Sequence, residues 1–226
     1  PKVLSAVPAE RSTGISTRKA RINFDEYIKL QNASEKVIVS PPQLESPNIR
    51  ADGKHIKIEL KDTLKPNTTY TIDFSDAIED NNEGNPMGNY TYSFSTGDDI
   101  DTMEVSGTVL NAEDLEPVKG MLVGLYPIDS NLTDSILRTT PFNRVSRTNG
   151  SGRFTIKGVK QGRYRAFALD DKDGNFIFSQ KSEKIAFDSV EFVTSCKRDV
   201  RMDTIWRDTI EYDSIRVVPY THFLPD

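Results

Sequence analysis

Between residues 64 and 97, aromatic and β-branched residues alternate with small polar ones. The apolar members of the two alternating runs are Tyr70, Ile72, Phe74, Tyr90, Tyr92 and Phe94. Successive side chains of a strand leave opposite faces, so this period of two predicts two strands that each bury one face. Residues 64–68 are typical of the corner that enters a sandwich strand. We therefore expect the Tyr70 hydroxyl to bond to backbone just upstream.

Short strands of the same kind recur throughout the first 98 residues. Residues 20–24 and 55–60 each place their large apolar side chains on one face, and the short apolar run at 36–40 is stopped by Pro41. Residues 24–28 suit a single helical turn. About seven short strands with almost no helical period predict an antiparallel sandwich.

Spaced residues across this segment resemble a known domain family. They are Val3, Ser5 and Pro8, then Ile22, Phe24, Asp25 and Glu26, and finally Asp80, Gly84, Asn85, Met87, Tyr92, Phe94 and Thr96. In this order they resemble the S-layer-type bacterial Ig-like domain. The resemblance implies an Ig-like sandwich over residues 1–98.

The connector from Ser75 to Asn89 is long for a sandwich and rich in Asp, Glu and Asn. Oxygen-rich loops can hold calcium. The spacing matches no ion-binding loop, however, and the same residue types shape tight turns through local hydrogen bonds. We favour turn chemistry for this connector.

A second set of spaced residues follows a short acidic joint at residues 97–101. Its members are Val105, Gly107, Val109, Pro117, Val118, Val123, Leu125, Tyr126, Thr148, Asn149, Gly152, Phe154, Ile156, Gly158, Val159, Gly162 and Tyr164. They resemble the carboxypeptidase-regulatory-like, prealbumin-type β-sandwich, which implies a second sandwich over residues 99–198. The glycines at 152, 158 and 162 stand where turns need positive φ or close backbone approach. Residues 129–147 look like an inserted surface loop.

The fold class expected is therefore all-β, with two tandem antiparallel β-sandwiches, Ig-like and then prealbumin- or transthyretin-like. The pair of domains resembles those of Bacteroidota envelope lipoproteins. Residues 199–226 break the pattern with a five-residue near-repeat, whose odd period cannot keep its isoleucines on one face of a strand. They are expected to form a bulged strand, an extended tail or the lead into a further domain.

The best metal candidate is the acidic stretch at residues 170–175. Asp171, Asp173 and Asn175 stand at alternate positions, as at the start of a calcium loop, and Gly174 permits a sharp turn. The glycine comes too early for an EF-hand, and acidic hairpin tips are common without metal. Calcium binding and simple turn chemistry both remain open, and no other cofactor is expected.

A tripeptide of Asp, then Ser or Thr, then an apolar residue occurs seven times, where random order would give about one. Its hydroxyl residues are Thr63, Thr102, Ser135, Ser189, Thr204, Thr209 and Ser214. The tripeptide resembles the O-glycosylation acceptor of Bacteroidota envelope proteins. The same residues are also ordinary turn-into-strand chemistry, so both interpretations stay open.

Composition narrows the function further. The 226 residues carry a net charge of −5, so a phosphate-neutralising surface for nucleic acid is not expected. The single cysteine excludes an internal disulfide. With only two histidines, a His-dependent catalytic triad or a zinc site is not favoured. No apolar run is long enough to span a bilayer. The chain begins at Pro1, so we expect any targeting signal or lipid anchor to lie upstream.

These features favour a non-enzymatic structural or interaction module. We expect a monomer that acts as a rigid spacer or presentation arm of a bacterial surface or periplasmic lipoprotein, in the periplasm or at the outer membrane of a Gram-negative cell. Its partner would be an envelope protein or a glycan. The alternative is a carbohydrate-binding module, to which Tyr126, Phe176, Phe178, Trp206 and Tyr212 could contribute exposed aromatic rings.

Overall fold

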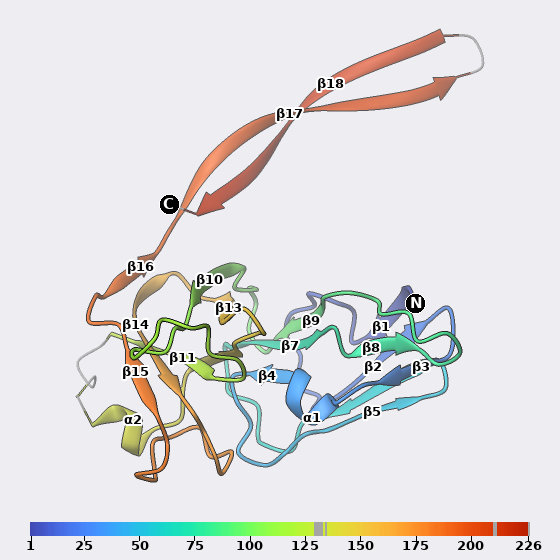
Figure 1. The fold of residues 1–226 in the computed structure, drawn as a ribbon. Coiled ribbons are helices and arrows are strands. Elements are labelled where there is room, and N and C mark those ends of the chain that lie inside the picture. The colour runs from blue at the N-terminus through green and yellow to red at the C-terminus, as the bar shows by residue number, and fades with distance from the viewer. Residues whose placement is uncertain (129–132, 134, 210–211, 226) are drawn as a thin grey trace.

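The computed structural model describes residues 1–128, 133, 135–209 and 212–225, the stretches from residue 196 onward by their backbone only. Within these residues every ladder between two strands is antiparallel, and the two helices are single turns. The all-β prediction is therefore confirmed. Figure 1 shows two β-rich bodies side by side, with a long hairpin extending from the second. None of the described helices is long and apolar enough to cross a bilayer.

The first sandwich contains nine strands and one helical turn. They are β1 (Val3–Val7), β2 (Lys19–Phe24), β3 (Ile28–Leu30), α1 (Ala33–Lys36), β4 (Ile38–Ser40), β5 (Asn48–Asp52), β6 (His55–Glu59), β7 (Thr69–Ser75), β8 (Ile78–Asp80) and β9 (Tyr90–Ser95). One sheet has the order β1-β2-β6-β5 and the facing sheet the order β4-β7-β9. The short pair β3-β8 completes this half.

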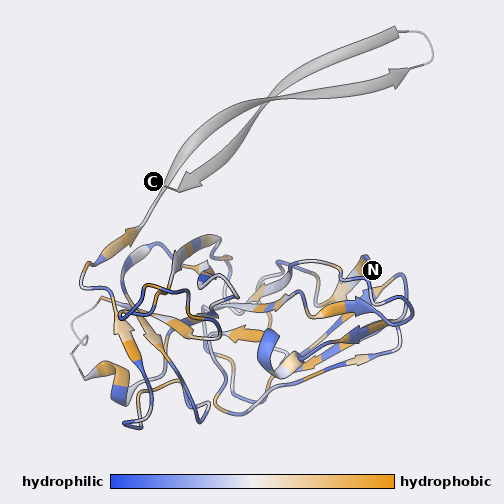
Figure 2. Ribbon diagram, in the orientation of Figure 1, coloured by the Kyte–Doolittle hydropathy of each residue, from blue (hydrophilic) through white to orange (hydrophobic). Residues whose placement is uncertain are grey.

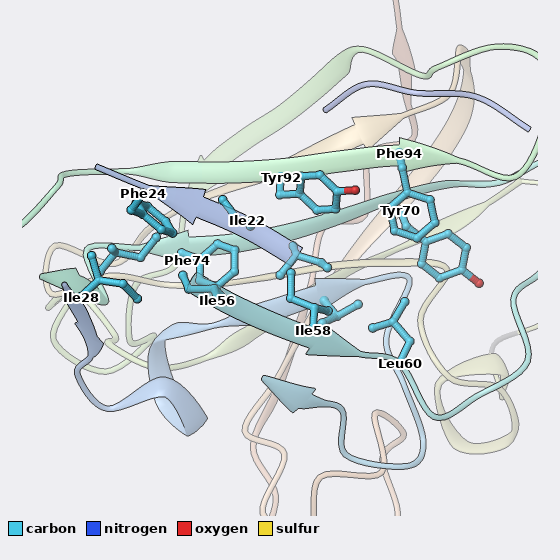
Figure 3. Close-up of a cluster of buried hydrophobic side chains, with 13 residues drawn as sticks. Ile22, Phe24, Ile28, Ile56, Ile58, Leu60, Tyr70, Phe74, Tyr92 and Phe94 are labelled. Atoms are coloured by element: carbon cyan, nitrogen blue, oxygen red, sulfur yellow. The ribbon is translucent and has the colours of Figure 1, made fainter. Parts of the chain in front are cut away.

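The alternating residues of the sequence form the core between these sheets (Figure 3). Ile22, Ile56, Ile72 and Tyr92 are fully shielded from solvent. Each strand contributes the residues of one face, as a period of two requires. The rings of Tyr70 and Phe94 stack across β7 and β9 with centroids 5.4 Å apart.

The predicted tyrosine corner is confirmed, because the backbone N–H of Lys65 donates to the Tyr70 hydroxyl at 2.8 Å. The helical turn expected at residues 24–28 is wrong. The backbone N–H groups of Asp25 and Ile28 donate to Lys2 and Gly53, on neighbouring segments, and not to carbonyls one turn back. Cross-strand hydrogen bonds therefore take the donors that a helical turn would need.

The second sandwich contains seven strands and one helical turn. They are β10 (Met103–Thr108), β11 (Leu122–Pro127), α2 (Ile136–Thr139), β12 (Arg144–Arg147), β13 (Arg153–Val159), β14 (Gly162–Leu169), β15 (Ile185–Phe187) and β16 (Phe192–Thr194). The larger sheet has the order β12-β11-β14-β15, with β16 also paired to β14, and β10-β13 forms the facing pair. Figure 2 shows apolar residues gathered on the strands and polar residues in most connecting loops.

The larger sheet is apolar on both faces. On β11, Val123 and Leu125 join the inner core toward β10-β13, whereas Leu122 and Tyr126 join an outer core with Leu137 of α2. Strand β14 divides in the same way between the two cores. This agrees with the mixed apolar pattern of residues 164–169, which a central strand buried on both sides requires.

The chain continues into a two-stranded hairpin of β17 (Cys196–Thr209) and β18 (Tyr212–Pro225). The strands pair from Cys196 opposite Pro225 to Thr209 opposite Tyr212 without a shift of register. The five-residue near-repeat therefore does not interrupt backbone pairing. In Figure 1 this hairpin projects away from the rest of the chain.

Candidate functional site at the junction of the two sandwiches

The two sandwiches meet where an edge strand of each lies against the other. Strand β4 ends one sheet of the first sandwich, and β12 ends the larger sheet of the second. The backbone N–H of Val145 on β12 donates to the Ser40 hydroxyl on β4 at 3.1 Å. Figure 1 shows β4 reaching toward the second sandwich. Two sheet edges thus cover each other at this junction.

Arg144, the first residue of β12, carries the charge at the centre of the junction. Its guanidinium donates to the carbonyl oxygens of Thr69 and Ser40, both in the first sandwich, the second at 3.4 Å. It lies 3.6 Å from the carboxylate of Asp101 in the joint between the sandwiches. The residue is only 4% exposed. This burial lowers the pKa of Arg144, and the Asp101 charge acts in the opposite direction.

Asp101 ties the joint itself to the first sandwich. Its backbone N–H donates to the Thr69 hydroxyl at 2.9 Å, so the residue that neutralises Arg144 is held at its main chain as well. Upstream in the joint, the Gly97 carbonyl accepts the N–H of Gly14 at 2.8 Å. The joint is thus hydrogen-bonded at both ends.

A second contact lies on β13, beside the first. The Lys157 ammonium lies 3.3 Å from the Asp73 carboxylate and donates to the Thr91 hydroxyl at 2.6 Å, and both partners are in the first sandwich. The next residue, Gly158, has a φ of +67°. A Cβ atom there would lie 2.8 Å from the Thr71 methyl group, so a larger residue at this position would press against the threonine side chains of the first sandwich.

One apolar contact completes the junction. Ile38 of β4 packs against the outer core of the second sandwich. The junction therefore has a buried, hydrogen-bonded polar centre with an apolar flank. Hydrogen bonds, ion pairs and one apolar contact thus join the two sandwiches at this place.

The sequence did not reveal this site. Residues 129–147 were expected to be a surface loop, but residues 144–147 form β12 and Arg144 is buried. Val145 is the single apolar residue of this run, so the sequence shows no strand period there. Nothing in sequence order links Arg144 to Thr69, 75 residues earlier.

The predicted metal residues lie in the loop between β14 and β15. The structure brings Asp171, Asp173 and Glu183 together, with one carboxylate oxygen of each within 4.8 Å of the others. Glu183 is an acid that the sequence pattern missed, because it stands twelve residues beyond Asp171 and outside the alternating run. The Asn175 side-chain oxygen instead accepts the N–H of Ile177 at 2.8 Å.

The carboxylates of this loop already have hydrogen-bond donors. Asp171 accepts the N–H groups of Gly174 and Phe176, and Asp173 accepts the side chains of Ser179 and Gln180. Burial raises the pKa of Asp171, whereas the hydrogen bond from Gln180 lowers the pKa of Asp173. The donor set suits calcium, and the same contacts shape the loop by turn chemistry alone. Calcium binding stays a prediction.

The connector at residues 75–89 is organised by one carboxylate. Asp80 accepts the backbone N–H groups of Asn82, Glu83, Gly84 and Asn85. These hydrogen bonds, that from Glu83 foremost, lower the pKa of Asp80. Such local bonding is what turn chemistry requires of an Asp-rich loop.

Four of the seven candidate glycosylation residues lie among the described side chains, and all four are exposed: Thr63, Thr102, Ser135 and Ser189. Three of their preceding acids have structural roles, however. Asp62 accepts the N–H groups of Leu44 and Glu45, Asp101 faces Arg144, and Asp188 accepts the N–H of Val190. The exposure of the four hydroxyl residues is compatible with glycosylation, and the contacts of the acids are compatible with turn chemistry. The side chains of Thr204, Thr209 and Ser214 lie outside the described residues.

The aromatic residues considered for glycan binding do not form an exposed platform among the described side chains. Tyr126 is buried in the outer core at 2% exposure. Phe176 and Phe178 are half-buried against the same core, and Arg138 lies over the Phe178 ring at 4.9 Å. The side chains of Trp206 and Tyr212 lie outside the described residues.

Comparison with known proteins gives one family match. Residues 1–96 match the model of the bacterial Ig-like domain, as the spaced motifs of that segment predicted. No curated protein sequence matches the chain.

Three solved structures are similar to the chain at low identity. The N-terminal part of the bacterial S-layer protein SbsC is 15% identical with a TM-score of 0.28, over 82% of this chain and 43% of that one. The pilus adhesin RrgA of Streptococcus pneumoniae is 14% identical with a TM-score of 0.23, over 69% and 26%. The T6 backbone pilin of Streptococcus pyogenes is 9% identical with a TM-score of 0.25, over 92% and 54%. The chain thus spans only about half, or less, of each structure, and TM-scores this low carry no argument about it.

Proposed function

We propose that this chain is a non-enzymatic structural module, a rigid arm that holds what lies on either side of it at a fixed separation and angle. The observation that carries the proposal is Arg144, a buried cation of the second sandwich whose hydrogen-bond acceptors belong to the first. If the two sandwiches were joined flexibly, we would expect a solvent-exposed charge at this position, because burying a cation without fixed partners is costly.

The free energy of the contacts at the junction is large enough to hold the two sandwiches in one arrangement. A hydrogen bond to a charged group contributes about 1.5–3 kcal/mol, and the junction holds several of them. Swinging the sandwiches apart would break the Arg144 contacts together with those of Lys157. With about 3 kcal/mol against it, an open arrangement would be populated at under about 1%.

The bacterial Ig-like match over residues 1–96 supports a place in the bacterial cell envelope. We further propose that the second sandwich is of the prealbumin type and that the chain belongs to a lipid-anchored protein of a Gram-negative envelope, as in Bacteroidota. The glycine and strand pattern of residues 105–164 and the recurrent Asp-[Ser/Thr]-apolar tripeptide support these assignments.

A distance measurement between the sandwiches tests the arm. Spin labels at Glu35→Cys and Lys160→Cys, both exposed, in a Cys196→Ser background report the separation by pulsed electron resonance. We expect one narrow distance distribution, which broadens in Arg144→Met. A broad distribution in the unaltered junction would refute rigidity. Protease shaving of intact cells of the native host tests the envelope assignment separately.

A further inference from the structure

Strand β15 forms an outer edge of the larger sheet, with its pairing partner β14 on one side only. The N–H of Asp170 donates to the Lys184 carbonyl at 2.8 Å, and the N–H of Asp188 donates to the Ala166 carbonyl at 3.2 Å. In an antiparallel ladder, hydrogen-bonded and non-hydrogen-bonded pairs alternate. The peptide groups of Ile185 and Phe187 therefore point away from β14, and no described segment pairs with them.

The side chains on this edge are apolar and exposed. Ile185 is 46% and Phe187 68% exposed. They stand opposite Leu169 and Phe167, so they extend the outer apolar face of the sheet past its last strand. Val190 and Val193, just beyond β15, are also exposed. An open ladder with an apolar face is a template for pairing with another strand.

We propose that β15 pairs antiparallel with β15 of a second copy of this chain, around a two-fold axis that passes beside Ala186. In this register Ile185 stands opposite Phe187 of the other copy, and all the outward peptide groups of both residues enter the new ladder. The apolar pairs fall on the outer face and join the outer cores of the two copies. Aromatic rings opposite β-branched residues are favourable cross-strand pairs.

The charges of the edge are complementary to themselves in this register. Lys184 stands opposite Asp188 of the other copy, and the two-fold axis repeats the pair. A shift of two residues in either direction separates these charges and leaves outward peptide groups unpaired. Charge complementarity thus selects a second copy as the partner, in one register.

The interface is small, because β15 has only three residues. Interfaces below standard size are weak or transient. The pairing is therefore a concentration-dependent association of otherwise separate copies, which departs from the monomer expected from the sequence. It is independent of the rigid-arm proposal, since β15 lies outside the contacts that join the two sandwiches.

Cysteine cross-linking of the full chain tests the register. In a Cys196→Ser background, Ala186→Cys places two thiols on the two-fold axis, where Cα atoms of a non-hydrogen-bonded pair lie about 4.5 Å apart, within disulfide range. Ser189→Cys, which is also exposed and lies three residues away, does not meet its own copy in this register. Under mild oxidation, we expect disulfide dimers to form at least about tenfold faster for Ala186→Cys than for Ser189→Cys. Equal rates, or no dimer with either, would overturn the proposal.

Charge exchange supplies an independent check. In the Ala186→Cys chain, Lys184→Asp places like charges opposite each other and should slow cross-linking severalfold, as should Asp188→Lys. The double variant restores opposite charges and should return the rate to within about twofold of the starting value. All these positions are exposed, and unchanged melting curves confirm folding. If the double variant stays slow, a second copy in this register is not the partner.

Discussion

Replacing Arg144 by methionine should weaken the coupling between the two sandwiches without leaving a large cavity, because the methionine side chain is also long and unbranched. The change removes two hydrogen bonds from a cation, one of them at the long distance of 3.4 Å, and leaves Asp101 without its partner. We count about 2–3 kcal/mol for the shorter bond and about 1 kcal/mol for the longer one.

Two effects modify this sum. Methionine has no charge to desolvate, whereas burial of the Arg144 guanidinium lowers its pKa and so disfavours the charged form. Against that, the Asp101 carboxylate is 21% exposed and loses a neutralising charge in a partly dry site. The two nearly offset each other, so we expect a net loss of about 3 kcal/mol from the coupling of the sandwiches.

Differential scanning calorimetry measures the result. If the sandwiches unfold as one unit of about 200 residues, a loss of 3 kcal/mol lowers the melting temperature by about 6–12 °C and splits the single transition in two. Arg147→Met is the matched control. Arg147 lies on the same strand but is exposed, and its guanidinium donates to the Gly120 carbonyl of its own sandwich, so a change within about 0.5 kcal/mol is expected. The reasoning fails if the two variants melt alike.

Four further outcomes follow from the described contacts. Gly158→Ala, at φ +67° and close to the first sandwich, should destabilise by about 1–3 kcal/mol in urea titrations, whereas Gly150→Ala, with open space around it, should be neutral. Backbone hydrogen bonds lower the pKa of Asp80 below its ordinary value of 3.8, so its contribution to stability is complete above 3.8 and is lost as pH falls toward the lower pKa of the folded state. The melting-temperature difference between the native chain and Asp80→Asn should therefore shrink between pH 6 and pH 3, and a constant difference would contradict the assignment. Excess calcium should raise the melting temperature relative to that in chelator, and Asp171→Asn should abolish that shift. Identical melting curves of the native chain in calcium and in chelator would refute calcium binding. Mass spectrometry of protein from the native host should find glycan at the Asp-[Ser/Thr]-apolar sites, and unmodified peptides at all seven would end that hypothesis.

The features that sequence predicts well here are those set by local pattern. Burial on one face of a strand repeats every second residue, which is why Ile56, Ile72 and Tyr92 could be assigned to the core. The corner of Tyr70 was also predictable, because donor and acceptor lie five residues apart. Its hydrogen bond depends on the geometry of one short segment.

The junction was not predictable for the opposite reason. The hydrogen bonds of Arg144 join residues 75 and 104 positions apart, and no periodicity relates such positions. The same holds for Glu183, whose carboxylate reaches Asp171 only because the loop folds back on itself. Contacts of this kind are set by how the strands are ordered and packed, and a single sequence carries no local trace of that order.

Because of the polar centre of the junction, the free energy that holds the two sandwiches together and the angle between them depend on different contacts. Apolar contacts such as that of Ile38 are non-directional, and they would hold the sandwiches together in several orientations at similar free energy. Hydrogen bonds from a buried guanidinium to two carbonyl oxygens require particular directions, so a rotated junction would leave the cation unpaired in a dry site. Arg144→Met should therefore widen the distribution of angles between the sandwiches while the apolar contacts still hold them together. A spin-label distribution that stayed narrow while the melting temperature fell would show that the apolar flank and Lys157 set the angle instead.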